Sequence, residues 1–96
     1  MLSSIHYLIR SKLDGQYLAA RAKTESGDKT INYLLVFKES FDALSYLNTH
    51  APDIAHQFSV ESIPATQLKG VLQRWGYVGI GVVNEPLEPR IQFVLV

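Results

Sequence analysis

The sequence predicts an α+β fold with a single mixed, mostly antiparallel sheet and two helices packed on one face. Three observations predict it. Short apolar runs between turn signals indicate six strands, two segments show apolar residues at helical spacing, and the order along the chain is β-β-β-α-β-α-β-β. Runs of strands with two interspersed helices favour one sheet with the helices segregated to one side. The 96 residues, 47% of them hydrophobic, form one domain over 1–96 with a core of modest size.

Composition excludes several classes of function. Cysteine is absent, which removes a disulfide framework, a thiolate zinc site and a cysteine nucleophile together. The formal net charge is zero, which argues against coating nucleic acid by charge and favours self-association. The N-terminus lacks the pattern of a signal peptide, and no apolar run is long enough to span a membrane. We therefore expect a soluble, cytoplasmic domain.

The first element predicted is a hairpin around Asp14 and Gly15. Asp-Gly between two alternating runs is the strongest short hairpin signal, because both central residues of a type I′ turn need positive φ. A two-residue turn places Lys12 opposite Tyr17. The strands are expected over residues 5–12 and 16–23.

This register divides the hairpin into two chemically different faces. One face is apolar and collects Ile5, Tyr7, Ile9, Leu18, Ala20 and Ala22. The other is basic and carries His6, Arg10, Lys12, Tyr17, Arg21 and Lys23. The basic face is typical of contact with phosphate, nucleic acid or an acidic protein. Because charged outer faces are usual, the favoured interpretation is a solvated face whose cations guard a sheet edge against aggregation.

A polar loop over residues 24–29 leads to a third strand over residues 30–38. The middle of this strand is apolar without alternation, so it should be covered on both faces. Ser40 is a good N-cap for a short helix over 41–49, which ends before Pro52. Its apolar stripe is expected to be Phe41, Leu44 and Leu47.

The next strand, over residues 56–63, alternates and should have one wet face. Pro64 suits the first position of the second helix, and Gly76 suits its C-terminal end. Between them lies the strongest helical pattern in the chain, formed by Leu68, Val71, Leu72 and Trp75. We expect Trp75 to lie in the core.

Residues 77–83 form the most apolar short run and read as a strand buried on both faces. Gly79 and Gly81 leave a slot on one face, and the preceding helix is the element expected to fill it. A last strand over residues 90–96 follows a turn. Val94 and Val96 lie on its outward side, and their exposure predicts a dimer surface.

The stretch over residues 33–86 resembles the N-terminal domain of SseB-type proteins, the enhanced-serine-sensitivity family. The matching motifs are Val36-Phe37-Lys38-Glu39-Ser40, Ala43-Leu44, Phe58-Ser59-Val60, Leu68 and Gly79-Ile80-Gly81-Val82-Val83-Asn84-Glu85-Pro86. The resemblance covers a little over half of the chain, and its motifs are structural. It implies an α/β domain with no transferable active site, and the basic hairpin is not part of the pattern.

No residue is assigned a catalytic, cofactor-binding or metal-binding role. His50 and His56 flank the Pro52 loop and could meet near Asp53, but their spacing matches no metal-ligand pattern. Gly79-x-Gly81 lies within a strand rather than opening a helix, so it is not a dinucleotide fingerprint.

These observations favour a non-enzymatic interaction module that forms a homodimer or binds another protein. The alternative is an anion or nucleic-acid binder that uses the basic hairpin face. A third hypothesis is a small enzyme with its site around His50, Asp53 and His56.

Overall fold

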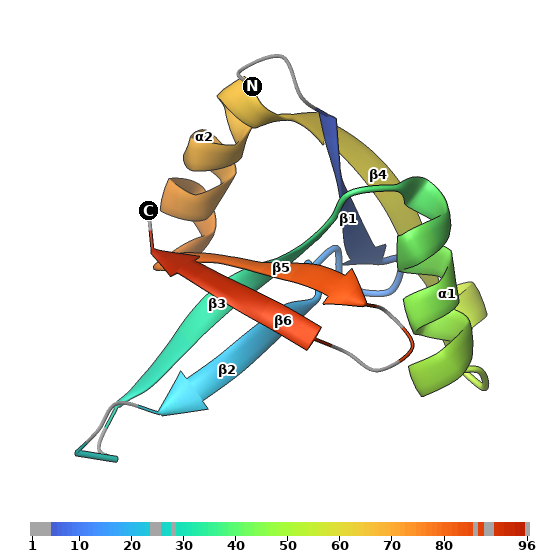
Figure 1. The fold of residues 1–96 in the computed structure, drawn as a ribbon, viewed down its shortest axis with the longest axis horizontal. Helices are drawn as coiled ribbons and strands as arrows, with labels where there is room; N and C mark the ends of the chain where they lie inside the picture. The colour runs from blue at the N-terminus through green and yellow to red at the C-terminus, as the bar shows by residue number, and fades with distance from the viewer. Residues whose placement is uncertain (1–4, 24–25, 28, 86, 88–89, 96) are drawn as a thin grey trace.

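The computed structural model describes residues 5–23, 26–27, 29–85, 87 and 90–95, and it confirms the α+β class and the order of elements. Six strands form one mixed sheet and two helices pack against it (Figure 1). The strands are β1 (Ile5–Ser11), β2 (Ala19–Lys23), β3 (Thr30–Phe37), β4 (Phe58–Pro64), β5 (Gly79–Glu85) and β6 (Arg90–Leu95). The helices are α1 (Ser40–His50) and α2 (Ala65–Trp75), with a short 3-10 turn over Ala55–Gln57. None of the described helices is long and apolar enough to cross a membrane.

The centre of the sheet is β3 rather than the glycine-containing β5. The strand order is β4-β1-β3-β5-β6, and β2 also pairs with β3. Only the β3–β5 pair is parallel, which confirms a mostly antiparallel sheet. β5 lies along one edge of β3, so β1 and β2 share the other edge, with Tyr7 opposite Phe37 and Ala19 opposite Leu34.

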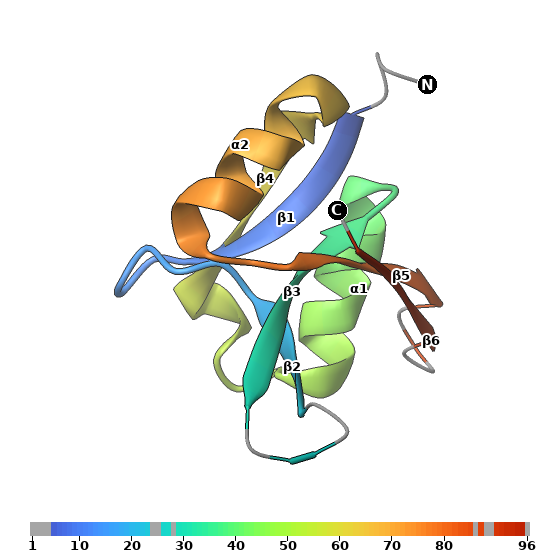
Figure 2. The ribbon, with the colours of Figure 1, turned by 90° about the vertical axis from the view of Figure 1, so that its left-hand side faces the viewer.

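The two helices lie on opposite faces of the sheet, and the prediction that they share one face is wrong. Leu34 and Val36 of β3 pack in a cluster with the apolar stripe of α2, whereas Leu35 and Phe37 pack with α1. Side chains alternate across a strand, so these two pairs point to opposite sides. Figure 2 shows α2 and α1 on either side of the strands. The uninterrupted apolar run in β3 correctly predicted cover on both faces, and each helix supplies one side.

The slot at Gly79 and Gly81 is filled by β6 and by a β3 side chain rather than by α2. A Cβ on Gly79 would meet the backbone of Val94 and lie 2.9 Å from the Cα of Leu95. A Cβ on Gly81 would lie 3.0 Å from Ile91 and 3.1 Å from Leu35. The glycines therefore let β6 approach β5 closely, and the predicted contact with the helix is wrong.

The hairpin turn differs from the prediction, although the two faces do not. The N–H of Ser11 donates to the carbonyl of Gln16 (2.8 Å), and Gly15 is the only residue of this loop with positive φ, so a four-residue loop replaces the type I′ turn. Arg10 rather than Lys12 lies opposite Tyr17, in an isolated bridge. The shift is two residues, which preserves the side on which every residue points.

The ends of both helices were predicted more accurately than the side chains that they bury. α1 begins at Ser40 with Glu39 as its N-cap, and it buries Ala43 and Leu47, while Phe41 is 64% exposed. The predicted stripe is therefore wrong at Phe41 and Leu44, which are exposed, and confirmed at Leu47. α2 buries Leu68, Val71 and Leu72 as predicted, and Gly76 ends it in the left-handed conformation (φ 76°).

Trp75 is 40% exposed, so its prediction as a core residue is wrong. It lies at the C-terminal end of α2, three residues beyond Leu72, the last residue of the helix in the buried cluster that includes Leu34 and Val36. The apolar stripe of the sequence therefore continues to Trp75, but the buried cluster beneath the helix does not. This exposed indole forms one wall of the site described next.

Candidate functional site

The basic hairpin face is not the outer surface that the sequence predicted, because α2 packs on it. Leu8 shares this face and is 1% exposed beneath α2. The helix therefore interrupts the predicted surface. The predicted site residues at the α2 side are His6, Arg10, Lys12, Tyr17, Arg21 and Lys23, and only Tyr17 and Arg21 line a pocket. Whether the remaining four contact a partner stays a prediction.

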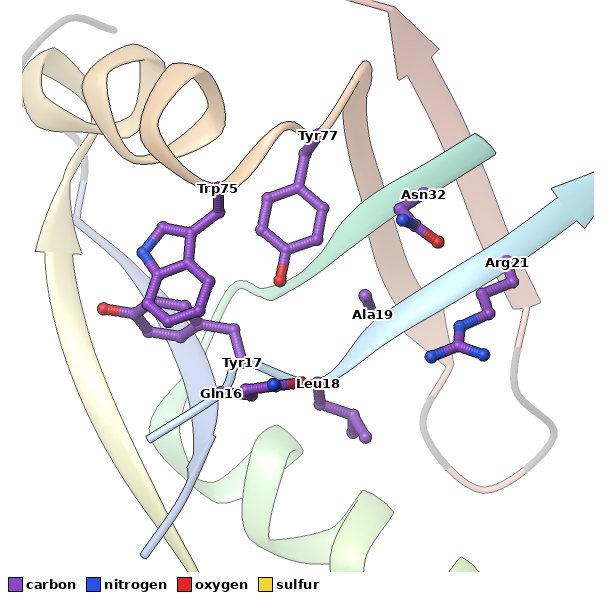
Figure 3. Close-up of a pocket in the computed structure, with 8 residues that line it drawn as sticks. All are labelled: Gln16, Tyr17, Leu18, Ala19, Arg21, Asn32, Trp75 and Tyr77. Atoms are coloured by element: carbon purple, nitrogen blue, oxygen red, sulfur yellow. The ribbon is translucent and has the colours of Figure 1, made fainter. Parts of the chain in front are cut away.

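The pocket lies where α2 ends and leaves part of β2 and β3 uncovered. Its volume is about 510 Å³, within the range of small-molecule sites. It is lined by Gln16, Tyr17, Leu18, Ala19, Arg21, Asn32, Trp75 and Tyr77. Figure 3 shows the aromatic side chains gathered at one end and the side chains of Arg21 and Asn32 at the other, with Ala19 between them.

Three aromatic residues from two parts of the chain form one end of the pocket. The rings of Tyr17 and Trp75 meet edge to face, with centroids 5.4 Å apart and an angle of 81°. Tyr77 follows the left-handed Gly76, and its N–H donates to the carbonyl of Leu72 (2.9 Å). The sharp turn that ends α2 therefore sets Tyr77 beside Trp75 over the sheet (Figure 3).

Arg10 holds Tyr17 in place from behind the pocket. Its guanidinium carbon lies 4.9 Å from the centroid of the Tyr17 ring, a cation–π arrangement. Its Nε donates to the carbonyl of Gly15 (2.7 Å), and its Nη1 lies 3.7 Å from a carboxylate oxygen of Glu61. Arg10 is thus engaged with its own hairpin and with β4, which makes it a positioning residue for Tyr17.

Arg21 and Asn32 face each other across the β2–β3 pair and form the polar part of the pocket. Arg21 is exposed at the surface of the pocket. The carbonyl of Asn32 accepts a hydrogen bond from the N–H of Val78 (3.0 Å). The side-chain oxygen of Asn32 is buried and has no hydrogen-bond partner among the described residues. A buried acceptor without a partner is unfavourable and is rare in folded proteins.

The phenol of Tyr77 is neutral over a wider pH range than an ordinary tyrosine. Burial raises the pKa of Tyr77 above its usual value of 10.0, and the neighbouring Tyr17 raises it further. The unfolded chain then releases this proton at lower pH than the folded chain does. The stability that Tyr77 contributes is complete below pH 10.0 and is lost as the pH rises through its higher folded pKa.

We therefore expect Tyr77→Phe to remove a phenol whose pKa in the folded protein lies above its usual value of 10.0. An ultraviolet absorbance titration of phenolate in wild type and variant measures this directly, because the chain has five tyrosines. The free energy of unfolding of the variant should also fall less steeply at alkaline pH. If the phenol missing from the titration of the variant instead ionises at or below pH 10.0, the buried environment of Tyr77 is contradicted.

The sequence-based reasoning found two of the eight lining residues and missed the rest. Trp75 and Tyr77 were assigned to packing elements, and Asn32 was treated only as part of a strand. The only signal in the sequence was the Trp-Gly-Tyr order, in which a helix-ending glycine separates two large aromatic residues. Within the described residues, no group of three His, Asp or Glu side chains is placed to hold a metal ion. The hypothesis of an enzyme site around His50, Asp53 and His56 stays a prediction.

Comparison with known proteins identifies no relative of this chain. No protein-family model, curated protein or solved structure matches the chain. The similarity to SseB-type domains over residues 33–86 stays a prediction.

Proposed function

We propose that this protein is a non-enzymatic module that associates with a second copy of itself through β6. The observation that carries the proposal is an apolar strand at the end of the sheet. Within the described residues β6 pairs with β5 alone, so its other edge offers backbone donors and acceptors to a further strand. Edge-to-edge pairing of this kind joins many proteins to their partners.

Apolar side chains on both sides of β6 support association. Phe93 and Leu95 are 49% and 72% exposed on the α1 side, and Val94 is 40% exposed on the α2 side. The ring of Phe93 packs against Tyr33, with centroids 4.7 Å apart, so part of this surface is already ordered. A second strand alongside β6 would cover apolar groups on both faces of the extended sheet.

The charge pattern favours a second copy over an acidic or basic partner. Arg90 is the only charged residue among the six of β6, and the chain has no net charge. In a fully overlapped antiparallel pair, Arg90 lies opposite Leu95 of the second copy. The two arginines are then at opposite ends of the interface, and like charges do not meet.

The test is the Leu95→Lys variant, measured by analytical ultracentrifugation over a range of concentrations. The substitution places a lysine opposite Arg90 of the second copy, and it does so twice because of the two-fold symmetry. Repulsion and desolvation should weaken association by about tenfold or more. The wild-type protein should dimerise in a concentration-dependent manner.

Leu13→Lys is the matched control, because Leu13 is 76% exposed in the hairpin loop and belongs to no proposed interface. It should associate like the wild type. A wild-type protein that remains monomeric at millimolar concentration would rule out the dimer. Equal association of Leu95→Lys and wild type would rule out β6 as its site.

A further inference from the structure

We propose that the pocket between β2, β3 and the end of α2 binds a nucleoside monophosphate. The proposal is independent of the β6 dimer. It rests on the arrangement of the lining: aromatic rings at one end, and a guanidinium next to an unsatisfied acceptor at the other (Figure 3). A nucleoside monophosphate has its groups in the matching order, with a flat ring at one end and a phosphate at the other.

The aromatic end is suited to a flat ring. Trp75 is 40% exposed although it ends the apolar stripe of its helix, and Tyr17 contacts it edge to face. Tyr17 is itself held by the guanidinium of Arg10. A base can therefore stack on rings that are already in place, and such stacking tolerates any base.

The guanidinium of Arg21 is suited to the phosphate. It projects from β2 at the end of the pocket away from the indole (Figure 3). Guanidinium groups bind phosphate through paired hydrogen bonds, which makes arginine better suited than lysine to this task. None of the eight described lining residues is acidic, so the local field favours an anion.

The same lining argues against a cationic ligand. Aromatic residues grouped in this way also bind quaternary ammonium groups. Here, however, Arg21 lines the pocket and Arg10 stands behind Tyr17, and both would repel a cation. An aromatic anion is the class of ligand that meets both the rings and the charge.

The side-chain oxygen of Asn32 specifies a hydrogen-bond donor on the ligand. This oxygen is buried at the pocket and lacks a partner among the described residues. After rotation of the Asn32 side chain toward the pocket, a ribose hydroxyl or an exocyclic base amine would supply the missing donor. Inorganic phosphate has no ring to stack at the aromatic end and would engage only the polar end of the pocket. We therefore expect the ligand to need both ring and phosphate.

Trp75 is the only tryptophan in the chain, so its fluorescence reports on this pocket alone. The experiment titrates the full chain with adenosine monophosphate, with adenosine and with inorganic phosphate. Saturable quenching is expected for the monophosphate, weaker quenching for adenosine and none for phosphate. Arg21→Gln should weaken binding of the monophosphate by about tenfold and leave adenosine binding unchanged, since one charge-assisted contact is lost.

Lys23→Gln is the matched control, because Lys23 lies two residues along the same strand and does not line the pocket. It should bind the monophosphate like the wild type, and circular dichroism should show that both variants are folded. Equal losses in the two variants would mean attraction by general charge and would overturn the proposal. Absence of saturable quenching by the monophosphate, including the case where only an oligonucleotide binds, would also overturn it. Repeating the titration with Leu95→Lys separates this result from dimerisation.

Discussion

Phe37→Ala is expected to lower the free energy of unfolding by about 3 to 5 kcal/mol, the usual cost of removing a fully buried aromatic ring. Phe37 is completely buried at the C-terminal end of β3, the central strand. It packs with Ala43 and Leu47 of α1, and its ring lies 5.4 Å from that of Tyr46. A domain of this size has a total stability of only about 5 to 14 kcal/mol, so the variant should be close to unfolding.

Urea denaturation followed by circular dichroism measures the loss. Phe41→Ala is the matched control, because it removes the same ring from the exposed side of α1. Its effect should be within about 0.5 kcal/mol of zero, as for most surface substitutions. Similar losses in the two variants would show that α1 presents a different side to the sheet from the one described here.

Gly79→Ala is expected to cost about 3 kcal/mol and to separate β6 from the sheet. The added methyl group would overlap the carbonyl oxygen of Val94 and lie 2.9 Å from the Cα of Leu95. These are backbone atoms, which cannot rotate away as a flexible side chain can. The strand must move instead, and the proposed dimer surface moves with it.

Gly70→Ala tests whether the steric contact is responsible. Gly70 lies within α2, and a Cβ there would meet nothing within 4 Å. This change should raise the free energy of unfolding by about 0.5 to 1 kcal/mol, because alanine favours the helix. Hydrogen exchange at residues 90–95 should accelerate in Gly79→Ala only. Unchanged exchange there would contradict the close approach of β6 to β5.

Several features of the fold were predictable because they depend on neighbours in the sequence. The alternation in residues 5–12 and 16–23 assigned each side chain to a face, and this assignment survived an incorrect turn. The observed register differs from the predicted one by two residues, and a shift of two leaves every side chain on its original side. The left-handed Gly76 at the end of α2 followed equally from local chemistry.

The pocket was not predictable because it depends on where two separate elements end. Trp75 continues the apolar stripe of α2, and in the sequence nothing distinguishes it from Leu72. Burial requires a partner surface, and the buried residues of the cluster below α2 include Leu72 but not Trp75. Asn32 and Arg21 became part of a site only because β2 pairs with β3 rather than with β1.

By itself, the sequence determined the order of the elements, the end of α2 at Gly76 and the side on which each residue of the first two strands points. These depend on contacts within a few residues, where the alternation of a strand and the conformational preferences of glycine act directly. Only the tertiary structure decided that the helices lie on opposite faces, that β3 is central and that β6 fills the glycine slot. Those outcomes depend on pairing between strands far apart in the chain, which local patterns allow in several ways and packing restricts to one.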